Sequence, residues 1–338
     1  MKTHGVALVG PGNVAKAHLM SIHDTARAEL VAIYARNLER GQAWAAEQDV
    51  SCPVYTGLDQ LLARDEVDIV ILCTPNHLHA SQTIQAAEAG KHILIEKPVA
   101  MNLPDLRAMQ AAVHKAGVRT LVSFVLHWNP SVRMTKKLIN EGAIGDVFMI
   151  ETCYWHSSPR GGGGHWSTKR ETGGSIFLMG GCHATDAARW LVGSDIVEVS
   201  AYTTRGGKDW VEYDPTAVAI VRFENGAIGR ISATMECVMP YAFDITVMGD
   251  QGTIRDNRLY SHLLSGQTDF ATIPTVLPNS GDVSHHPFGP GLEHFITCID
   301  EGRETEINLD EAINTHQVCL AVDLSAEEGR PVSLPLSG

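Results

Sequence analysis

Short apolar segments alternate with helical stretches through the first third of the chain, and this alternation restricts the possible folds more than any other feature. Apolar runs typical of buried strands occupy residues 6–9, 30–34, 69–73, 93–95 and 120–123. Sequence with helical periodicity fills the intervals, at residues 14–23, 38–47, 78–89 and 103–115. Strands that alternate with helices are typical of parallel βαβ units. We therefore predict an α/β domain with a doubly wound parallel sheet, the Rossmann architecture.

The pattern changes beyond Phe124. Further strands are indicated by a long run into Trp155 and by residues 217–223, 227–234 and 243–248. Turn sequences at residues 224–226 and 249–252 join consecutive strands, which predicts antiparallel pairing. Late helices near residues 292–301 and 310–327 close this part of the chain. We predict two domains, residues 1–123 and residues 124–338, the second an α/β domain with a large, mostly antiparallel open sheet.

Charge and composition exclude several classes of protein. The 338 residues include 26 Lys and Arg against 39 Asp and Glu, a formal net charge of -13, which argues against nucleic acid as a partner. No apolar run approaches the roughly 20 residues that span a bilayer, and the N-terminus enters a strand without a signal peptide. Seven cysteines, an odd number, lie mostly in apolar segments, which favours reduced thiols. We expect a cytoplasmic protein with no membrane partner.

The first candidate site is the turn Gly10-Pro11-Gly12-Asn13-Val14-Ala15, which follows the first strand and opens the first helix. Glycines here permit a tight turn and close approach of the backbone to a pyrophosphate, while the helix N-terminus supplies N–H donors. Ala15 takes the place of the third glycine, which the dinucleotide fingerprint permits. The strand-turn-helix context favours a dinucleotide site over an ordinary βα turn. Residues 1–123 are therefore predicted to bind the cofactor.

The end of the second strand bears on which dinucleotide binds. NAD sites usually place an acidic residue here to hold the ribose 2′-hydroxyl, whereas this chain has Ala35, Arg36 and Asn37. An arginine pairs well with the 2′-phosphate of NADP. The sequence favours NADP. NAD stays open as the alternative, because the same residues would occur if Arg36 only stacked beside the adenine or faced solvent.

Three later motifs complete a pattern that resembles a known family. They are Thr74-Pro75-Asn76 with His79, Glu96-Lys97-Pro98, and Gly173-Gly174 leading to Gly181-Cys182-His183-Ala184-Thr185-Asp186. Together with the glycine turn, their order and spacing resemble the Gfo/Idh/MocA oxidoreductases, named for glucose-fructose oxidoreductase and inositol dehydrogenase, over nearly the full length. The resemblance implies an NAD(P)-dependent dehydrogenase that transfers a hydride between nicotinamide and a secondary alcohol of a sugar, sugar derivative or inositol.

By this resemblance the catalytic residues are Lys97 and His183. In the family, the Glu-Lys-Pro lysine reaches the reacting hydroxyl and the nicotinamide, and the later helix enters the substrate cleft. The residues predicted to bind the cofactor are Gly10, Gly12, Asn13, Val14, Ala35, Arg36, Asn37, Thr74, Pro75, Asn76, His79, Glu96 and Lys97. Aromatic rings beside short polar side chains suit a polyol. The residues predicted to contact substrate are Lys97, His127, Trp155, His156, Arg160, His165, Trp166, Met179 and His183.

Met179 departs from the family pattern. Many relatives carry an aspartate at this position, and a thioether does not exchange a proton. Lys97 and His183 remain as the groups able to exchange the hydroxyl proton. We favour His183 as the acid/base and Lys97 as the group that positions the hydroxyl, and the reverse assignment stays open. Glu96 is expected to support Lys97, and Asp186 to orient His183 or to cap structure.

Structural explanations compete with each of these assignments. Lys97 fits a solvent-facing lysine after a strand, and His183 fits a core histidine whose hydrogen bonds are satisfied. Sixteen histidines suggest a metal site, yet the adjacent pair His285-His286 and the neighbours Cys182 and His183 match no known ligand spacing. We predict no bound metal.

Two other functions stay open. One is a glycosidase that uses tightly bound NAD for transient oxidation and elimination, a chemistry that some relatives carry out. The other is a non-catalytic NAD(P) sensor, which needs the first domain but not Lys97. The presence of both Lys97 and His183 argues against the sensor.

The second domain is also expected to mediate assembly. Strands at residues 217–223 and 227–234 carry apolar residues in both alternations, so one apolar face of the sheet would stay exposed in a monomer. Relatives pair such faces. We therefore expect a homodimer or homotetramer formed through this sheet.

Overall fold

The computed structural model describes residues 2–157, 164–278 and 286–337, and the chain divides into two compact units. The first unit comprises Met1–Ser123 and Pro287–Ile313, and the second comprises Phe124–His286 and Asn314–Gly338. The chain leaves the first unit between residues 123 and 124, where the sequence places its domain boundary. The return of Pro287–Ile313 to the first unit differs from the expected limits of 1–123 and 124–338.

A six-stranded parallel sheet forms the centre of the first unit. Its strands are β1 (His4–Val9), β2 (Ala28–Tyr34), β3 (Val54–Tyr55), β4 (Ile69–Leu72), β5 (His92–Ile95) and β6 (Thr120–Val122). They lie in the order β3-β2-β1-β4-β5-β6, and every neighbouring pair is parallel. All residues of β1 and β4 are buried, as expected for strands that are covered on both faces. The predicted doubly wound sheet is confirmed.

The first unit contains helices between these strands and one helix, α9, from the later segment 287–313. They are α1 (Asn13–His23), α2 (Leu38–Glu47), α3 (Leu58–Leu62), the 3-10 helix η1 (Asn76–Leu78), α4 (His79–Glu88), α5 (Leu103–Ala116) and α9 (Phe288–Glu301). Asn37 caps α2 by accepting a hydrogen bond from the Arg40 N–H at 2.8 Å. Short β3 and α3 were not predicted, because two and five residues carry too little periodicity to detect.

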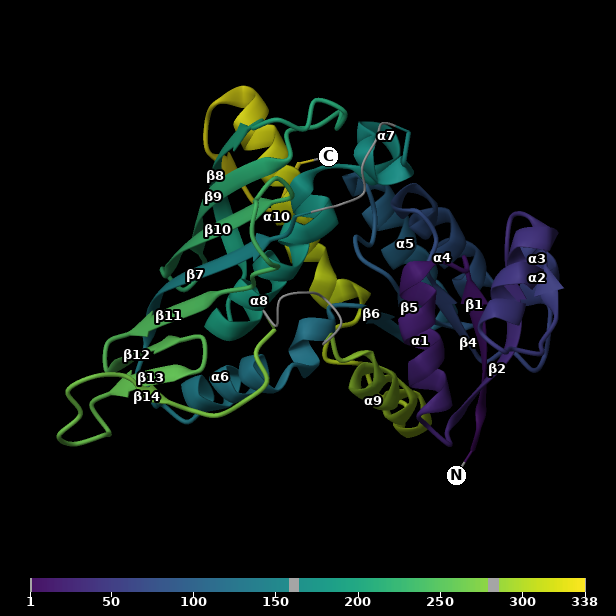
Figure 1. The fold of residues 1–338 in the computed structure, drawn as a ribbon, viewed down its shortest axis with the longest axis horizontal. Coiled ribbons are helices and arrows are strands. Elements are labelled where there is room, and N and C mark those ends of the chain that lie inside the picture. The colour runs from purple at the N-terminus through teal and green to yellow at the C-terminus, as the bar shows by residue number, and fades with distance from the viewer. Residues whose placement is uncertain (1, 158–163, 279–285, 338) are drawn as a thin grey trace. The chain divides into compact units, whose positions relative to one another are not determined.

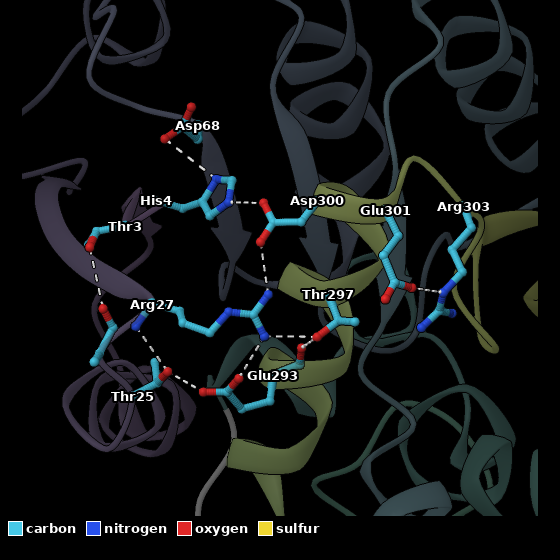
Figure 2. A network of polar contacts seen from close by, with 11 residues as sticks. Thr3, His4, Thr25, Arg27, Asp68, Glu293, Thr297, Asp300, Glu301 and Arg303 are labelled. Carbon is cyan, nitrogen blue, oxygen red and sulfur yellow. Dashed lines mark hydrogen bonds and ion pairs between the residues drawn. The ribbon is translucent and has the colours of Figure 1, made fainter. Parts of the chain in front are cut away.

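A polar network attaches α9 to the N-terminal ends of β1 and β2 (Figure 2). Arg27, which precedes β2, donates to Glu293 at 3.1 Å, to Thr297 at 2.8 Å and to Asp300 at 2.9 Å. The Nε2 atom of His4 lies 2.8 Å from the same Asp300. These contacts explain why the segment 287–313 belongs to the first unit. The expectation that this late helix closes the second domain was wrong.

A nine-stranded sheet forms the second unit. Its strands are β7 (Val147–Trp155), β8 (Ile196–Thr204), β9 (Thr216–Phe223), β10 (Ile228–Thr234), β11 (Ile245–Gly249), β12 (Gly252–Arg255), β13 (Arg258–Ser261), β14 (Ala271–Thr272) and β15 (Val332–Ser333). They lie in the order β14-β13-β12-β11-β7-β10-β9-β8-β15. The β7–β10 pair is parallel, whereas the other pairs are antiparallel. A mostly antiparallel sheet was predicted and is confirmed.

Helices cover one face of this sheet. The helical segments are η2 (Val125–Trp128), α6 (Pro130–Asn140), η3 (Trp166–Thr168), α7 (Arg170–Gly173), the π-helix η4 (Phe177–Gly181), α8 (Cys182–Val192) and α10 (Leu309–Glu328). Figure 1 shows α8 and α10 on the same side of the strands, and α8 packs on β7 and β10. The opposite face carries apolar residues that are exposed: Tyr202 (81%), Ile220 (52%) and Ile228 (49%).

Two further observations concern the described part of the chain. None of its helices is both long enough and apolar enough to cross a bilayer. All seven cysteines lie in this part and are free thiols, and Cys153, Cys182, Cys298 and Cys319 among them are buried. Burial raises the pKa of Cys319 well above that of an ordinary thiol, so this group stays protonated and unreactive in the core.

Candidate active site

The turn between β1 and α1 has the form that a dinucleotide pyrophosphate requires. Gly10 has φ of +93°, and a Cβ atom there would lie 2.7 Å from the Thr74 side chain, so only glycine fits. A Cβ atom on Gly12 would meet nothing within 4 Å, which leaves open space above the turn. No side chain caps α1 at Gly12. Asn13 and Val14 therefore begin the helix with N–H groups available to an anion, and these residues fit the cofactor.

The loop after β2 contains three residues that were predicted to bind the adenosine side of the cofactor, and the structure gives them different roles. Ala35 is buried, while Arg36 is exposed and no acidic residue stands at either position. The Asn37 side chain serves as the α2 N-cap. Ala35 and Arg36 therefore fit a surface that faces a ribose, whereas the geometry of Asn37 is explained by helix capping alone.

The loop after β4 is fixed by buried hydrogen bonds. The Thr74 hydroxyl donates to Gln82 at 2.5 Å, and Asn76 is buried in η1 directly after Pro75. His79 lies between two carbonyl oxygens, with Nδ1 at 2.7 Å from Pro98 and Nε2 at 2.8 Å from Thr74. Both ring nitrogens are thus engaged by backbone. His79 connects the loops after β4 and β5, and its predicted contact with the cofactor stays a prediction.

The charge state of His79 follows from opposing influences. Burial lowers the pKa of His79 and outweighs the carbonyl oxygens of Pro98 and Thr74, which act in the opposite direction. The neutral imidazole that this favours donates from one nitrogen only, and therefore to one of the two carbonyls. The His79 ring joins the loops after β4 and β5, at the edge of the sheet that is predicted to bind the cofactor.

Lys97 follows β5 at the carboxyl edge of the parallel sheet and is half-buried. Its backbone N–H donates to Glu96 Oε2 at 3.2 Å. The other oxygen of Glu96 lies 2.9 Å from Nε2 of His18, a buried residue of α1. Burial acts to raise the pKa of Glu96, but hydrogen bonding and charge from His18, with the charge of Lys97, outweigh it and the pKa is lowered. Glu96 supports the Lys97 backbone, and its predicted contact with the cofactor stays a prediction.

In the second unit, His183 lies in the first turn of α8, directly after the π-helix η4. Its side chain is buried, with 4% of the residue exposed. Tyr154 of β7 stacks against it at 5.8 Å between ring centroids and 17° between planes. A Cβ atom on Gly180 would lie 2.4 Å from the Tyr154 ring, so glycine in the π-helix makes this stacking possible. π-helical turns of this kind frequently occur at functional sites.

We name five of the rings at this position the ring cluster: Tyr154, His156, His183, Tyr241 and His286. Phe124 makes a further edge contact with His183, at 5.9 Å between ring centroids. Tyr241 makes edge contacts with Tyr154 at 5.4 Å, with His156 at 5.9 Å and with His286 at 5.8 Å. His286 lies 6.0 Å from His183, which closes a loop of rings. His156 was predicted to contact substrate, whereas Tyr241 and His286 were not.

His127 and Asp186 form a separate buried pair. His127 Nε2 lies 2.6 Å from Asp186 Oδ2, and the imidazole stacks on Trp190 at 4.2 Å. Both residues are buried in the core of the second unit. This pair gives His127 a structural role, and its predicted contact with substrate stays a prediction. The Asp186 carboxylate binds His127, so the expectation that it orients His183 is not supported.

The remaining predicted substrate residues are dispersed. Trp155 follows Tyr154 in β7, so its side chain points to the opposite face of the sheet, where its indole N–H donates to Ser232 at 3.1 Å. His165 caps η3, which Trp166 begins. Met179 lies within η4, four residues before His183. Arg160 lies outside the described residues.

A dinucleotide turn with a lysine at the same sheet edge, and a histidine buried among rings on a separate sheet unit, defines a two-domain nicotinamide-dependent oxidoreductase. Family comparisons agree. Residues 4–124 match the model described as "Oxidoreductase family, NAD-binding Rossmann fold", and residues 132–255 match the "GFO/IDH/MocA C-terminal domain". The protein belongs to the GFO/IDH/MocA family of oxidoreductases, as the motifs predicted.

Individual relatives extend this likeness. The chain is 30% identical over 223 residues to 1,5-anhydro-D-fructose reductase of Ensifer adhaerens, covering 66% of this chain and 67% of the relative. It is 28% identical over 281 residues to scyllo-inositol 2-dehydrogenase (NAD(+)) of Bacillus subtilis, covering 81% and 80%. A solved levoglucosan dehydrogenase, in complex with NADH and L-sorbose, has a TM-score of 0.89 and 25% identity, with full coverage of both chains.

Among the described residues, no group of three or more His, Cys, Asp or Glu side chains is placed to hold a metal ion.

Proposed function

We propose that the protein is an NAD(P)-dependent dehydrogenase that oxidises a secondary alcohol of a sugar, a sugar derivative or an inositol, or reduces the corresponding ketone. The observation that carries this proposal is the position of His183, a proton-exchanging group buried within a cluster of rings in a family of dinucleotide oxidoreductases. Rings that stack on apolar sugar faces beside polar groups suit such a substrate. The printed names of the relatives are consistent with it.

The proposed chemistry divides between two residues. When bound, the nicotinamide supplies the hydride acceptor or donor. His183 takes the hydroxyl proton during oxidation and returns it during reduction. Lys97 positions the reacting hydroxyl by donating a hydrogen bond, and Glu96 holds the Lys97 backbone in place. Met179 takes no part in proton transfer, because a thioether carries no exchangeable proton.

The function is tested by absorbance of reduced nicotinamide with a panel of scyllo-inositol, levoglucosan and D-apiose, using protein from which any cofactor has been stripped. Steady reduction of added NAD or NADP supports the dehydrogenase. Product formation without net reduction identifies a glycosidase that re-reduces its intermediate. Binding of the dinucleotide without any turnover identifies a sensor.

We further propose that Arg36 makes NADP the preferred dinucleotide. The support is an exposed arginine directly after β2 and the absence of an acidic side chain at residues 35 and 36. Replacement of Arg36 by alanine is expected to weaken NADP binding roughly 10- to 100-fold, the loss of a charge-assisted contact, and to change NAD binding little. Titration calorimetry of both dinucleotides measures the difference.

Arg40 provides the matched control for this substitution, because it is an exposed arginine in the first turn of α2, the helix that begins two residues after Arg36. Arg40→Ala should leave the ratio of NADP to NAD affinity unchanged. Equal weakening of both dinucleotides in Arg36→Ala would contradict the selectivity proposal and indicate that Arg36 packs against the adenine.

The open face of the second sheet is proposed to form a homodimer or homotetramer interface. Tyr202, Ile220 and Ile228 expose large apolar surfaces on three adjacent strands, an arrangement that monomers rarely retain. Sedimentation equilibrium at micromolar protein is expected to show an oligomer, and Ile220→Glu is expected to shift it towards the monomer. Met20→Glu, an exposed apolar position in the first unit, is the control. A single wild-type species near 36.6 kDa would contradict the interface.

A further inference from the structure

Tyr241 is the member of the ring cluster whose polar atom has no evident role. It lies beside the end of β7, where the next residue, Ala242, exchanges two backbone hydrogen bonds of 2.9 Å with Trp155. Only 4% of Tyr241 is exposed. Its ring is surrounded by Tyr154, His156 and His286 at interplanar angles of 65° to 71°. The backbone bonds hold the ring firmly at this place.

The Tyr241 hydroxyl is buried, and among the described residues it has no hydrogen-bond partner. An unsatisfied buried hydroxyl is destabilising, so proteins seldom retain one without a use for it. Burial, together with the nearby Tyr154, raises the pKa of Tyr241, and the group therefore remains a protonated donor. Phenylalanine would fill the same space among these rings without leaving a polar atom unsatisfied.

The surroundings of the hydroxyl indicate what could satisfy it. The Tyr241 ring contacts the rings of Tyr154 and His286, and each of these two rings contacts His183. A polyol carries several hydroxyls on one ring. When the reacting hydroxyl is held at His183, the others are presented to neighbouring members of the ring cluster. An O–H donor placed there recognises a substrate hydroxyl oxygen.

We propose that Tyr241 is a specificity-determining residue whose hydroxyl donates a hydrogen bond to a substrate hydroxyl other than the one that reacts. This inference rests on the proposed function. Within the described part of the chain the Tyr241 donor is unsatisfied, and in this proposal the substrate completes its hydrogen bonding. A substrate analogue that lacks the partner hydroxyl is discriminated against, because the donor then stays unsatisfied in the complex.

Tyr241→Phe tests the proposal, with Tyr213→Phe as its control. Tyr213 is a buried tyrosine of the same unit, and its hydroxyl donates to the Ser167 carbonyl at 2.7 Å. For Tyr241→Phe, we expect a melting temperature without ligand equal to or above that of the wild type. We also expect KM for the best substrate of the panel to rise roughly 3- to 15-fold, with kcat within a few-fold. Tyr213→Phe should lower the melting temperature and leave KM unchanged.

Monodeoxy analogues of that substrate locate the partner hydroxyl, because the analogue that lacks it should give the same KM with the wild type and with Tyr241→Phe. The stabilisation of the NADH complex by the substrate should also be smaller in Tyr241→Phe. An unchanged KM in Tyr241→Phe, with active wild type, overturns this inference alone. Failure of the wild type to bind or turn over any member of the panel overturns the proposed function and this inference with it.

Discussion

Replacement of Lys97 by alanine is expected to reduce turnover by roughly 10²- to 10⁴-fold, the range for loss of a positioned proton-exchanging or hydrogen-bonding group. Dinucleotide binding should remain within a few-fold of the wild type, because the pyrophosphate is assigned to the turn at Gly10 and Gly12. Initial rates of nicotinamide reduction and calorimetric titration of the dinucleotide measure the two quantities separately.

Lys91 is the matched control for this substitution. It stands at the opposite end of the same strand, where its ammonium donates to the Arg64 carbonyl at 2.9 Å. Lys91→Ala should retain full turnover. If Lys97→Ala kept half of the wild-type activity, the catalytic assignment would fail, and a matching loss of dinucleotide binding would instead assign Lys97 to the cofactor.

Replacement of Arg27 by methionine is expected to destabilise the first unit by about 2 kcal/mol, because it removes hydrogen bonds to Glu293, Thr297 and Asp300 in a partly exposed setting. Methionine keeps most of the aliphatic volume. Hydrogen exchange of the α9 amides should accelerate, since this helix loses its main polar attachment (Figure 2). Urea unfolding gives the change in stability.

Arg303→Met is the control, because Arg303 pairs with Glu301 on the surface of the same segment and not with β1 or β2. It should leave α9 exchange unchanged. Unaltered α9 exchange in Arg27→Met would show that apolar packing alone holds the helix.

The effect of Arg27→Met should also depend on pH. Hydrogen bonds from His4 and Arg27 lower the pKa of Asp300. A carboxylate whose pKa is lowered in the folded state contributes stability that is present above its unfolded pKa of about 4 and is lost as the pH falls through the folded value. The difference between wild type and Arg27→Met should therefore shrink on acidification below about pH 4.

The parallel sheet could be predicted from the sequence because its strands are buried on both faces. β1 and β4 are continuous apolar runs, and glycine follows α5 at Gly117 with φ of +66°. Such signals lie within short stretches of sequence and can be recognised without knowing which strands pair. Lys97 and His183 were assigned by resemblance to family motifs, and their catalytic roles stay a proposal. Each lies at a boundary that the sequence indicates, after the end of β5 or in the first turn of α8.

The errors concern contacts between residues that are far apart in the chain. The partners of Arg27 lie 266 to 273 positions away, so no periodicity could place α9 beside β2. Asp186 stands three residues after His183 on one helix, which favoured a pair between them. His127, which is 59 positions from Asp186, binds the carboxylate instead. Tyr241 carried no motif, and His286 was considered only as half of the pair His285-His286, so their ring contacts with Tyr154 and His183 were not predicted.

The first unit is discontinuous in the chain, and this affects the order in which the protein is completed during synthesis. A ribosome releases residues in sequence and domains generally fold as units. Residues 124–286 must therefore leave the ribosome before α9 can bind His4 and Arg27, at the N-terminal ends of β1 and β2. The first unit can therefore be completed only after most of the second unit has been synthesised. A fragment that ends at Ser123 lacks α9 and would expose the polar ends of β1 and β2 to water.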